Sequence, residues 1–464
     1  MTDRLSIVLI LVDDLGWADI GLNGSSFYET PHIDALGLGG INYTQAYASA
    51  PVCSPTRASL LTGKYPARVG VTQFINGFGH GALRDVPYCR ELPGDEHSLA
   101  RALQRAGWAT WHVGKWHLGP KPTWPKNHGF DVNIGGWDSG QPDSYWSPYR
   151  IPTLDDGPVG EYLTDRLTDE AIALIESAGD QPFFLNLWHY AVHIPCQAPA
   201  DLVAKYRAKA RTLGLDDDHA IELGEYQPMS RRSHLRVARR TVQSDPVYAA
   251  MIENLDTNVG RLIEALERTG RRESTLVVFT SDNGGLATAE GSPTCNLPLR
   301  EGKGWLEEGG LRVPFIVNLP GVIPGAGTVS GVFTSPDLYP TVLDACGLPT
   351  IPVQHVDGIS AWPDWIDPGS APDRPPVFWH YPHYSNQGGS PAAAVRIGRY
   401  KLIRSFDGGA EQLYDVVEDP GEAIDLAGVE AIVRQDLSAL LDGWLADVGA
   451  LVPRPIVVVR ESKE

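Results

Sequence analysis

The residues best suited to chemistry in this chain are a cysteine and an arginine placed around a proline. The segment C-S-P-T-R occupies residues 53–57, and the apolar run after it ends at Gly63. Pro55 is typical of a first helical turn, where its missing N–H costs no hydrogen bond, and Gly63 is typical of a helix end. Cys53 is therefore predicted at a helix N-terminus, where free N–H groups and the helix dipole favour an anion. That position suits a nucleophile, although a lone cysteine before a helix is more often an ordinary buried side chain.

Two polar pairs offer ligands for a metal ion. Asp13 and Asp14 follow one apolar run, and Asp282 and Asn283 follow another. One such pair is ordinary loop chemistry, but both together supply three carboxylates and one amide oxygen. This all-oxygen set suits calcium or magnesium rather than zinc, and calcium accepts the looser and higher coordination.

Lysine and histidine side chains in three further segments could act on an anionic ester. Lys115 and His117 lie in H-V-G-K-W-H-L-G, residues 112–119, and alternation along an extended segment places both on one side. His193 follows an apolar run, and Lys303 lies in a glycine-rich segment. A lysine can neutralise an anion, and a histidine can move a proton near neutral pH. Taken singly, each is more often a structural histidine or a solvated charge, so only their convergence would make a site.

The pattern of apolar runs predicts how these residues are positioned. Runs typical of buried strands alternate with helical periodicity, which indicates an α/β fold with a large mixed, mainly parallel sheet flanked by helices. Ligands of such sheets lie at the carboxyl ends of the strands, where the polar residues above are found. The predicted strands are Leu5–Val12, Trp108–Val113, Pro182–Trp188 and Thr275–Thr280, and the predicted helices are Ser98–Ala106, Tyr162–Ser177 and Val247–Arg268.

The chain divides into a catalytic domain over residues 1–363 and a C-terminal subdomain over 377–464. A stretch rich in Pro, Asp and Gly separates them and is a candidate linker. In the C-terminal part, Ala394–Ser405 and Gln412–Val417 are predicted strands of a smaller sheet, and Ala431–Ala446 has the periodicity of a helix. Residues 206–245 form a polar, arginine-rich insertion. A solvated surface segment is the simplest interpretation of it, with a lid or a subunit contact as alternatives.

Composition limits the class of protein. The 464 residues carry a formal net charge of -19, which argues against a general nucleic-acid binder and against binding to an anionic membrane. Leu5–Val12 is too short to span a membrane and has no cleavage site after it, so we expect a cytoplasmic protein unless the start is truncated. Five widely spaced cysteines with no C-x-x-C pair argue against a disulfide framework.

The C-x-P-x-R segment at 53–57 resembles the signature of the type I, formylglycine-dependent sulfatases of the alkaline phosphatase superfamily. The segments around Lys115, His193 and Lys303 are also similar to motifs of that family. The C-terminal part resembles the family's C-terminal subdomain, which implies an antiparallel sheet with a packed helix. The resemblance implies that Cys53 is converted to formylglycine by a formylglycine-generating maturation enzyme. It also implies one Ca²⁺, with ligands Asp13, Asp14, Asp282, Asn283 and the formylglycine oxygen at position 53. Two-zinc phosphatases of the superfamily typically have Asp-His where this chain has Asp282-Asn283.

The resemblance further implies sulfate-ester hydrolysis with S–O cleavage. An oxygen of the hydrated formylglycine would attack sulfur, and His117 would take a proton from the second hydroxyl to expel sulfate. His193 and Lys303 would stabilise or protonate the departing alcohol. Arg57 and Lys115 would hold the formylglycine and the sulfate, and several cations together could outweigh the protein's repulsion of an anion.

The substrate is predicted to be a small sulfate ester, with a sulfated sugar favoured over a simple aryl sulfate. The chain looks most similar to exo-acting carbohydrate sulfatases, and activity on small aryl sulfates is also expected. Segments rich in aromatic and polar residues suggest Asp138, Trp146, His380 and His383 as substrate-binding residues. Packing of buried aromatic side chains explains the same segments equally well.

Two other functions remain compatible with the sequence. One is a phosphonate or phosphate ester hydrolase that uses the same nucleophile. The other is a catalytically silent binding protein in which Cys53 stays unmodified. The oligomeric state is open, and a homo-oligomer is one option.

Overall fold

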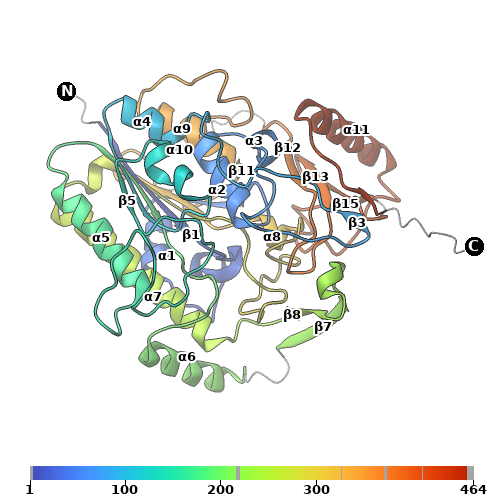
Figure 1. Ribbon diagram of the computed structural model, residues 1–464, viewed down its shortest axis with the longest axis horizontal. Helices are drawn as coiled ribbons and strands as arrows, with labels where there is room; N and C mark the ends of the chain where they lie inside the picture. The colour runs from blue at the N-terminus through green and yellow to red at the C-terminus, as the bar shows by residue number, and fades with distance from the viewer. Residues whose placement is uncertain (1–3, 216–219, 326, 370–373, 410, 457–464) are drawn as a thin grey trace, which may run out of the picture.

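The computed structural model describes residues 4–215, 220–325, 327–369, 374–409 and 411–456. Its main feature is an eight-stranded sheet with the strand order β11-β2-β10-β9-β1-β6-β4-β5 (Figure 1). Among the described strands of this sheet, β10 runs antiparallel to its neighbours and the others run parallel to one another. The predicted mixed, mainly parallel sheet is confirmed. Its strands are β1 (Ser6–Val12), β2 (Ile41–Tyr47), β4 (Ala109–Gly114), β5 (Val132–Ile134), β6 (Phe183–Trp188), β9 (Thr275–Ser281), β10 (Phe315–Asn318) and β11 (Gly327–Thr334).

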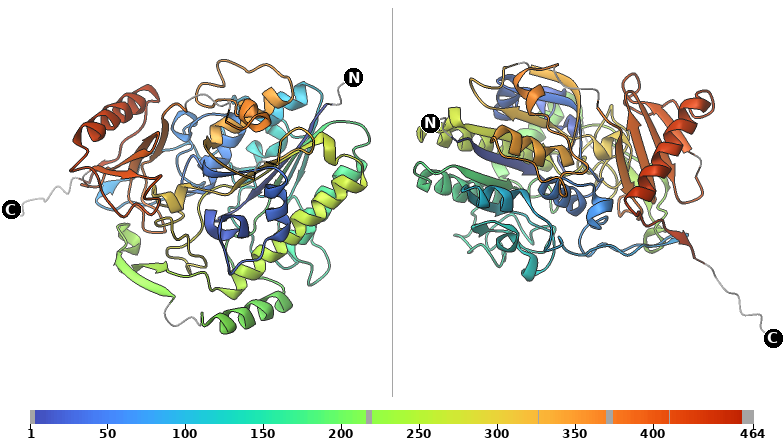
Figure 2. Two further views of the ribbon diagram at one scale, coloured as in Figure 1. Left: turned by 180° about the vertical axis from the view of Figure 1, so that it is seen from behind. Right: turned by 90° about the horizontal axis from the view of Figure 1, so that it is seen from above.

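The centre of this sheet is buried on both faces. Every residue of β1, β6 and β9 is buried, which explains why these strands read as continuous apolar runs in the sequence. Alternate residues of β1 contribute to two different cores: Val8 and Ile10 face one, and Ile7 and Leu9 face the other. Figure 2 shows helices on both sides of the sheet.

The helices that cover the two faces differ. One core contains residues of α1 (Pro31–Leu38), α5 (Leu163–Ser177), α6 (Ala200–Leu213) and α7 (Pro246–Arg268). The other contains residues of α2 (Cys53–Thr62), α4 (Leu99–Arg105), α9 (Leu338–Ala345) and α10 (Trp362–Ile366). The four strands and three helices predicted for the main domain are all present. None of their ends differs from the prediction by more than one residue.

The ends of three helices have capping residues, of which Gly63 was predicted from the sequence. The side chain of Asp245 accepts hydrogen bonds from the N–H groups of Val247 and Tyr248 and so caps α7, with Pro246 in the first turn. Ser98 caps α4 in the same way. Gly63 ends α2 with a φ of 68°, a left-handed conformation that glycine adopts without strain, and its N–H donates to the carbonyl of Ser59.

A separate four-stranded antiparallel sheet lies toward the C-terminus. Its order is β12-β13-β14-β15, and α11 (Ala431–Asp447) packs on it, with Trp444 stacked on Phe378 at 4.8 Å between ring centroids. The predicted antiparallel sheet with a packed helix is confirmed. The strands are β12 (Val377–Tyr381), β13 (Ala392–Ile397), β14 (Tyr400–Ser405) and β15 (Glu411–Asp415). The predicted linker overlaps α10, and its residues 370–373 lie outside the described part of the chain.

The predicted insertion at 206–245 contains the end of α6 and a two-stranded hairpin. The hairpin pairs β7 (Ile221–Tyr226) with β8 (Arg236–Arg240) beside the main body of the molecule (Figure 1). Residues 216–219 lie outside the described part. Within the described residues, no helix is long and apolar enough to cross a membrane.

Candidate active site

Four polar residues converge at the carboxyl ends of β1 and β9. These strands are parallel neighbours, so Asp13 and Asp14 meet Asp282 and Asn283 although about 270 residues separate the two pairs. The N–H of Asp14 donates to Asp282 Oδ1 at 3.2 Å, and Asn283 Nδ2 donates to Asp14 Oδ1 at 2.8 Å. Asp14 has a φ of 62°, a left-handed conformation that is uncommon for a residue other than glycine and that turns its side chain into this cluster.

Two oxygens of this cluster are buried without a hydrogen-bond partner among the described residues. They are Asp13 Oδ1 and Asn283 Oδ1. A buried oxygen without a partner costs free energy, so each needs a ligand to satisfy it. Ligand atoms of Asp13, Asp14 and His193 also lie within 4.8 Å of one another, as they would around one ion. The residues present therefore fit a hard cation that is held mainly by oxygen ligands, such as calcium.

Each carboxylate of the cluster has a basic partner. Lys115 Nζ lies 2.5 Å from Asp13 Oδ2, and Lys303 Nζ lies 2.7 Å from Asp14 Oδ2. Burial, together with the neighbouring carboxylate of Asp282, raises the pKa of Asp13 to about 8. Burial acts to raise the pKa of Asp14 as well, but the nearby ammonium of Lys303 outweighs it and holds that pKa below its ordinary value. The pKa values of the two adjacent carboxyls thus differ because Asp13 faces the carboxylate of Asp282, whereas Asp14 faces the ammonium of Lys303.

Arg57 joins the metal cluster to the nucleophile helix. Its side chain is fully buried, donates from Nε to Asp282 Oδ2 at 2.8 Å, and donates from Nη1 to the carbonyl of Lys115 at 3.1 Å. Its guanidinium also lies over the ring of Trp188, 5.1 Å from the centroid. These contacts give it a structural reason to be an arginine, because a lysine has neither the planar fork nor the stacking surface.

Gly114 places the Lys115 segment. Its φ is 102°, and a Cβ at this position would come within 2.0 Å of the carbonyl oxygen of Trp188. The absence of a side chain lets β4 approach β6 closely enough for the N–H of Lys115 to donate to that same carbonyl at 2.7 Å. The lysine is thereby directed toward Asp13.

Cys53 is the first residue of α2, as predicted, and it is buried. Its Sγ lies 3.2 Å from Nδ1 of His117, and burial raises the pKa of the thiol. Burial, and then the charge of Lys115, lowers the pKa of His117 well below its ordinary value, so this imidazole is neutral at physiological pH. His117 has a φ of 54°, and its carbonyl accepts a hydrogen bond from Ser54 Oγ at 2.8 Å. The neutral imidazole beside position 53 is placed to accept a proton.

His193 lies beside the carboxylates of Asp13 and Asp14. Its Nδ1 is 2.9 Å from the carbonyl of Ile194, and its Nε2 is 3.6 Å from Asp14 Oδ2. Burial, and then the charge of Lys303, lowers the pKa of His193 to about 3. The hydroxyl of Tyr145 donates to the carbonyl of His193 at 2.8 Å and fixes the turn that carries it.

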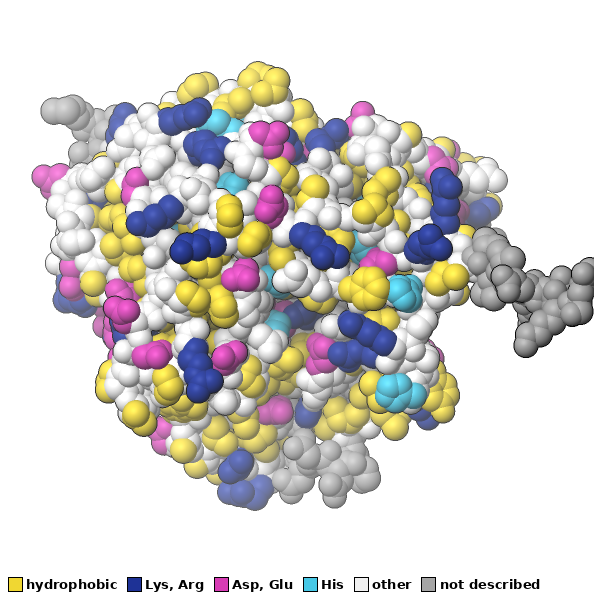
Figure 3. Space-filling view, viewed as in Figure 1, with side chains coloured by type: hydrophobic (Ala, Val, Ile, Leu, Met, Phe, Trp, Pro, Cys, Tyr) yellow, Lys and Arg dark blue, Asp and Glu magenta, His cyan; other side chains and the backbone are white. Residues whose placement is uncertain are grey.

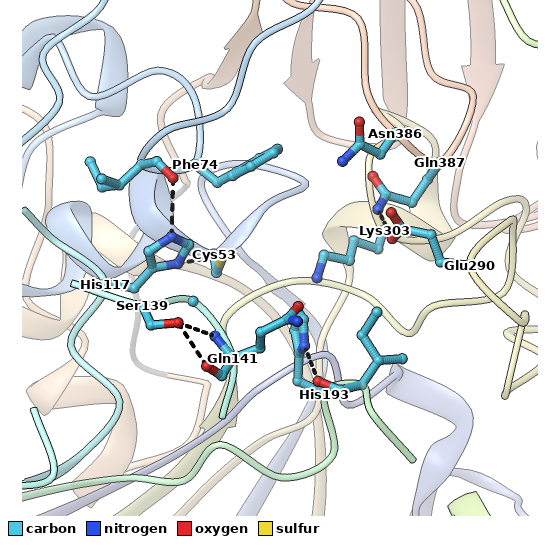
Figure 4. Close-up of a pocket in the computed structure, with 13 residues that line it drawn as sticks. Cys53, Phe74, His117, Ser139, Gln141, His193, Glu290, Lys303, Asn386 and Gln387 are labelled. Carbon is cyan, nitrogen blue, oxygen red and sulfur yellow. Dashed lines mark hydrogen bonds between the residues drawn. The ribbon is translucent and has the colours of Figure 1, made fainter. Parts of the chain in front are cut away.

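A pocket of about 350 Å³ opens onto these residues. Figure 4 shows Cys53 and His117 on one side of it, Glu290, Asn386 and Gln387 on the other, and Lys303 reaching between them. The predicted residues Cys53, His117, His193 and Lys303 all line the pocket. The remaining lining residues are Phe74, Ile75, Ser139, Gly140, Gln141, Ile194, Glu290, Asn386 and Gln387.

Most of the lining was not predicted. Asn386 and Gln387 follow the aromatic cluster at residues 379–384 after one intervening residue, and Ser139 to Gln141 directly follow Asp138. The sequence signal therefore identified the correct loops but not their pocket-facing residues. Glu290 gave no signal, since it stands in a loop without a recognisable motif.

The four predicted substrate-binding residues are not among the described residues that line the pocket. His380 is buried within β12 with its Nε2 3.1 Å from the carbonyl of Leu451. His383 is buried between Thr72 Oγ1 at 2.9 Å and Asp85 Oδ1 at 2.6 Å. These contacts give both histidines structural partners away from the pocket lining.

Trp146 and Asp138 differ from the histidines. The ring of Trp146 packs on Tyr162 at 4.8 Å between centroids, as part of the core under the loop. Asp138 directly precedes the pocket residue Ser139 but does not line the pocket itself. Packing rather than substrate contact therefore explains the tryptophan.

Comparisons with known proteins agree with this geometry. The family described as Sulfatase matches residues 6–348, and a second family, described as N-sulphoglucosamine sulphohydrolase, C-terminal, matches residues 302–444. The N-acetylgalactosamine-6-sulfatase of Mus musculus is 32% identical over 422 residues, which cover 85% of this chain and 71% of that protein. Arylsulfatase A of Homo sapiens is 32% identical over 480 residues, with coverage of 94% and 86%.

Solved structures also resemble the chain. Ps i-CgsB in complex with k-i-k-neocarrahexaose has a TM-score of 0.76 at 28% identity and covers 95% of this chain and 92% of its own. A protein solved with its substrate D-glucosamine-2-N,6-O-disulfate shares the fold, with a TM-score of 0.70 at 21% identity, and covers 96% of this chain and 97% of its own. The oxygen-rich cluster, the buried Cys53 beside His117 and these extensive matches lead to one conclusion. The chain belongs to the sulfatase family and is a sulfuric ester hydrolase.

Proposed function

We propose that this sulfatase hydrolyses sulfate esters by S–O cleavage, using a formylglycine derived from Cys53 and one bound Ca²⁺, and that its substrate is a sulfated carbohydrate. Small aryl sulfates are secondary substrates. The observation that carries the proposal is the position of Cys53 in the pocket, with its Sγ 3.2 Å from a neutral His117 and the carboxylate cluster adjoining it.

The calcium ligands would be Asp13, Asp14, Asp282, Asn283 and the oxygen at position 53. Asp13 and Asn283 carry the buried oxygens that lack a hydrogen-bond partner among the described residues. The carboxylate of Asp282 is already oriented by its ion pair with Arg57. Bound calcium supplies a positive charge that polarises an oxygen ligand and lowers its pKa. Hydrated formylglycine supplies one hydroxyl that attacks sulfur and a second that allows sulfate to leave.

The chain's own residues then have distinct roles. His117, which is neutral because it is buried, accepts a proton at Nδ1 from the group at position 53. Lys303 has a pKa raised above its ordinary value, so it stays charged and stabilises negative charge on the departing alcohol rather than giving up its proton readily. His193 also lines the pocket, and Lys115 lies 2.5 Å from Asp13 and adds positive charge to the cluster.

The lining of the pocket supports a carbohydrate substrate. Gln141, Asn386 and Gln387 present amide groups that can both donate to and accept from sugar hydroxyls. Phe74 and Ile75 add an apolar surface beside Cys53 that can contact the C–H face of a ring. Two matched proteins carry a sulfated sugar in their names or titles, the N-acetylgalactosamine-6-sulfatase and the protein solved with D-glucosamine-2-N,6-O-disulfate.

Hydrolysis in water enriched with ¹⁸O tests the reaction. 4-Nitrophenyl sulfate and N-acetylgalactosamine 6-sulfate should both be cleaved, and the label should appear in sulfate rather than in the alcohol. Label in the alcohol would contradict S–O cleavage. The ratio of kcat/KM for 4-nitrophenyl sulfate to that for 4-nitrophenyl phosphate should favour sulfate, and a preference for phosphate would favour the phosphate ester hydrolase instead.

The maturation of Cys53 is tested separately. Conversion to formylglycine by the maturation enzyme lowers the mass of the peptide that contains residue 53 by about 18 Da, a covalent change of the side chain. Active protein should contain this lighter peptide. Active protein in which every such peptide retains the cysteine would refute the nucleophile, and inactive unmodified protein would fit the silent binding protein.

A further inference from the structure

A second cavity adjoins the catalytic pocket on the side of the β7–β8 hairpin. It has a volume of about 540 Å³, and Glu290 lines both it and the catalytic pocket, so the two cavities lie on either side of that residue. We call it the hairpin groove. The other groove residues are Ile221, Leu223, Gln227, Arg232, His234, Leu235, Arg236, Ala238, Ala289, Gly291 and Ser292.

The hairpin is basic in a chain that is otherwise acidic. Residues 221–240 contain five arginines and two glutamates, a difference of three positive charges (5 − 2), whereas the whole chain has a formal charge of -19. Figure 3 shows Lys, Arg and His side chains on the part of the surface where Figure 1 places β7 and β8. A positive patch on a negative protein raises the local concentration of anions.

Carboxylates neutralise only some of this charge. Arg239 is paired with Glu225 and Glu301, and Arg232 is paired with Glu290. Arg236 instead donates to the carbonyls of Leu223 and Gly224, and no carboxylate lies within ion-pair distance of it among the described residues. Among the described residues, therefore, no carboxylate balances the charge of Arg236, which lines the groove.

The segment between β7 and β8 also supports the residues that form the far wall of the catalytic pocket. Arg231 donates to Asn386 Oδ1 at 2.7 Å, and Arg232 donates to the carbonyl of Asn386 at 3.3 Å and to Glu290 at 3.1 Å. Gln387 Nε2 donates to the other oxygen of Glu290 at 2.6 Å. Glu290 accepts hydrogen bonds from both Arg232 and Gln387. Its negative charge is therefore partly neutralised and repels an anionic ligand less at the boundary between the two cavities.

We infer that the hairpin groove binds a second, anionic sugar residue of an oligosaccharide whose sulfated residue occupies the catalytic pocket. The inference rests on the proposed function and extends it from a monosaccharide to a chain. Arg236 and His234 supply donors for a sulfate or carboxylate, and Ile221, Leu223 and Leu235 supply apolar contacts for the ring. The arginine-rich segment is thus a substrate-binding element rather than only a solvated surface.

Binding rather than turnover tests the groove, so that the result does not depend on the chemistry. Full-length Cys53→Ala protein is titrated by calorimetry with disaccharides and tetrasaccharides of carrageenan, chondroitin 6-sulfate and heparan sulfate. In at least one series the tetrasaccharide should bind about tenfold more tightly than the disaccharide, the effect of one charge-assisted hydrogen bond. Raising the salt concentration should reduce this gain, because the contact is ionic and exposed.

Two variants in the same background locate the gain. Arg236→Gln keeps a donor for the hairpin carbonyls but removes the charge, and it should reduce the gain to about twofold or less. His234→Ala, an exposed side chain, provides a second variant that does not depend on the hairpin contacts of Arg236. Arg207→Ala, which removes an exposed charge from α6, is the matched control and should leave the gain unchanged.

Each result is decisive. A gain that is absent in all three series, or that survives unchanged in both groove variants, overturns the inference. Loss of the gain in Arg207→Ala as well would also overturn it, since a general loss of positive charge would then be the cause. Parallel assays of unsubstituted protein on 4-nitrophenyl sulfate separate the two ideas. No hydrolysis with an intact length gain would sink the proposed function alone, and hydrolysis without a length gain would sink the groove alone.

Discussion

Two clusters of buried charge in this protein are built from the same kinds of side chain but differ in whether they are complete. The interface cluster lies between the main body and the C-terminal sheet. Lys401 of β14 bonds to Glu308 at 2.9 Å and to Glu422 at 3.0 Å, and Tyr47 donates to Glu308 at 2.7 Å. Arg396 of β13 bonds to the Tyr47 hydroxyl. In the part of the chain that the structure describes, none of these side chains has a buried polar atom without a partner.

The catalytic cluster is not satisfied in this way. It places three aspartates beside Arg57, Lys115 and Lys303, yet it leaves Asp13 Oδ1 and Asn283 Oδ1 without hydrogen-bond partners among the described residues. It also opens onto a cavity, whereas the interface cluster is enclosed. The difference teaches that a closed charge network stabilises the fold by itself, while an open one is completed only by its ligands.

The largest expected effect comes from removing the nucleophile. Cys53→Ala should lower kcat by about 10⁴-fold or more, because loss of a nucleophile removes the covalent step. The melting temperature should change little, since Cys53 contributes a small side chain to the packing. Turnover of 4-nitrophenyl sulfate and thermal melting measure the two effects. Cys89→Ala, at an exposed cysteine, is the control and should retain activity. Ordinary activity of the Cys53→Ala protein would show that the catalytic cluster does not carry the reaction.

Calcium should stabilise the open cluster. At a hundred times the Kd, a ligand that binds only the folded protein adds about 3 kcal/mol to the free energy of unfolding. The melting temperature should therefore rise when Ca²⁺ replaces a chelator, and activity should return with it. Asp282→Asn should abolish this calcium-dependent rise, and Asp155→Asn, at an exposed carboxylate, should preserve it. An undiminished rise in Asp282→Asn would mean that the ion binds elsewhere.

The interface cluster predicts unequal costs for two similar substitutions. Burial acts to raise the pKa of Glu308, but Lys401 and then Arg312 outweigh it and lower that pKa, so Glu308 is charged. Burial raises the pKa of Glu422 to about 8, so Glu422 is mostly protonated at neutral pH. Glu308→Gln should cost about 2–4 kcal/mol of unfolding free energy because it breaks a buried ion pair, and Glu422→Gln less than about 1 kcal/mol. Urea unfolding measures both; equal costs would contradict this division of charge.

The smallest effect is the pH dependence of the same cluster. The folded-state pKa of Glu422 is about 8 and the ordinary value is 4.5, so between these pH values the folded protein holds a proton that the unfolded chain has released. Stability from this group is therefore present at low pH and lost as the pH rises through 8. Glu422→Gln lacks this loss, so its melting temperature should improve relative to the unsubstituted protein between pH 5 and pH 9. A difference that stays constant over this range would show that Glu422 does not carry the proton.

Much of the fold was predictable because its signals are local. Continuous apolar runs predicted β1, β6 and β9, since strands buried on both faces need apolar residues throughout. Helical periodicity predicted α7 to within one residue of its ends. Proline and glycine placed Cys53 at the start of α2 and Gly63 at its end.

The catalytic and metal-binding residues of the site could also be predicted from the sequence, but the residues that form the wall of its pocket could not. The sequence by itself determined which residue types follow the central strands, and parallel strands bring such residues to one edge. Only the tertiary structure decided that the His380 side chain is buried against the carbonyl of Leu451 and that Asn386 and Gln387 face the pocket. It also decided that an arginine between β7 and β8 donates a hydrogen bond to Asn386. The physical reason is that strand ends are positioned by backbone hydrogen bonds of the sheet, whereas loop side chains are oriented by contacts with residues far away in the chain.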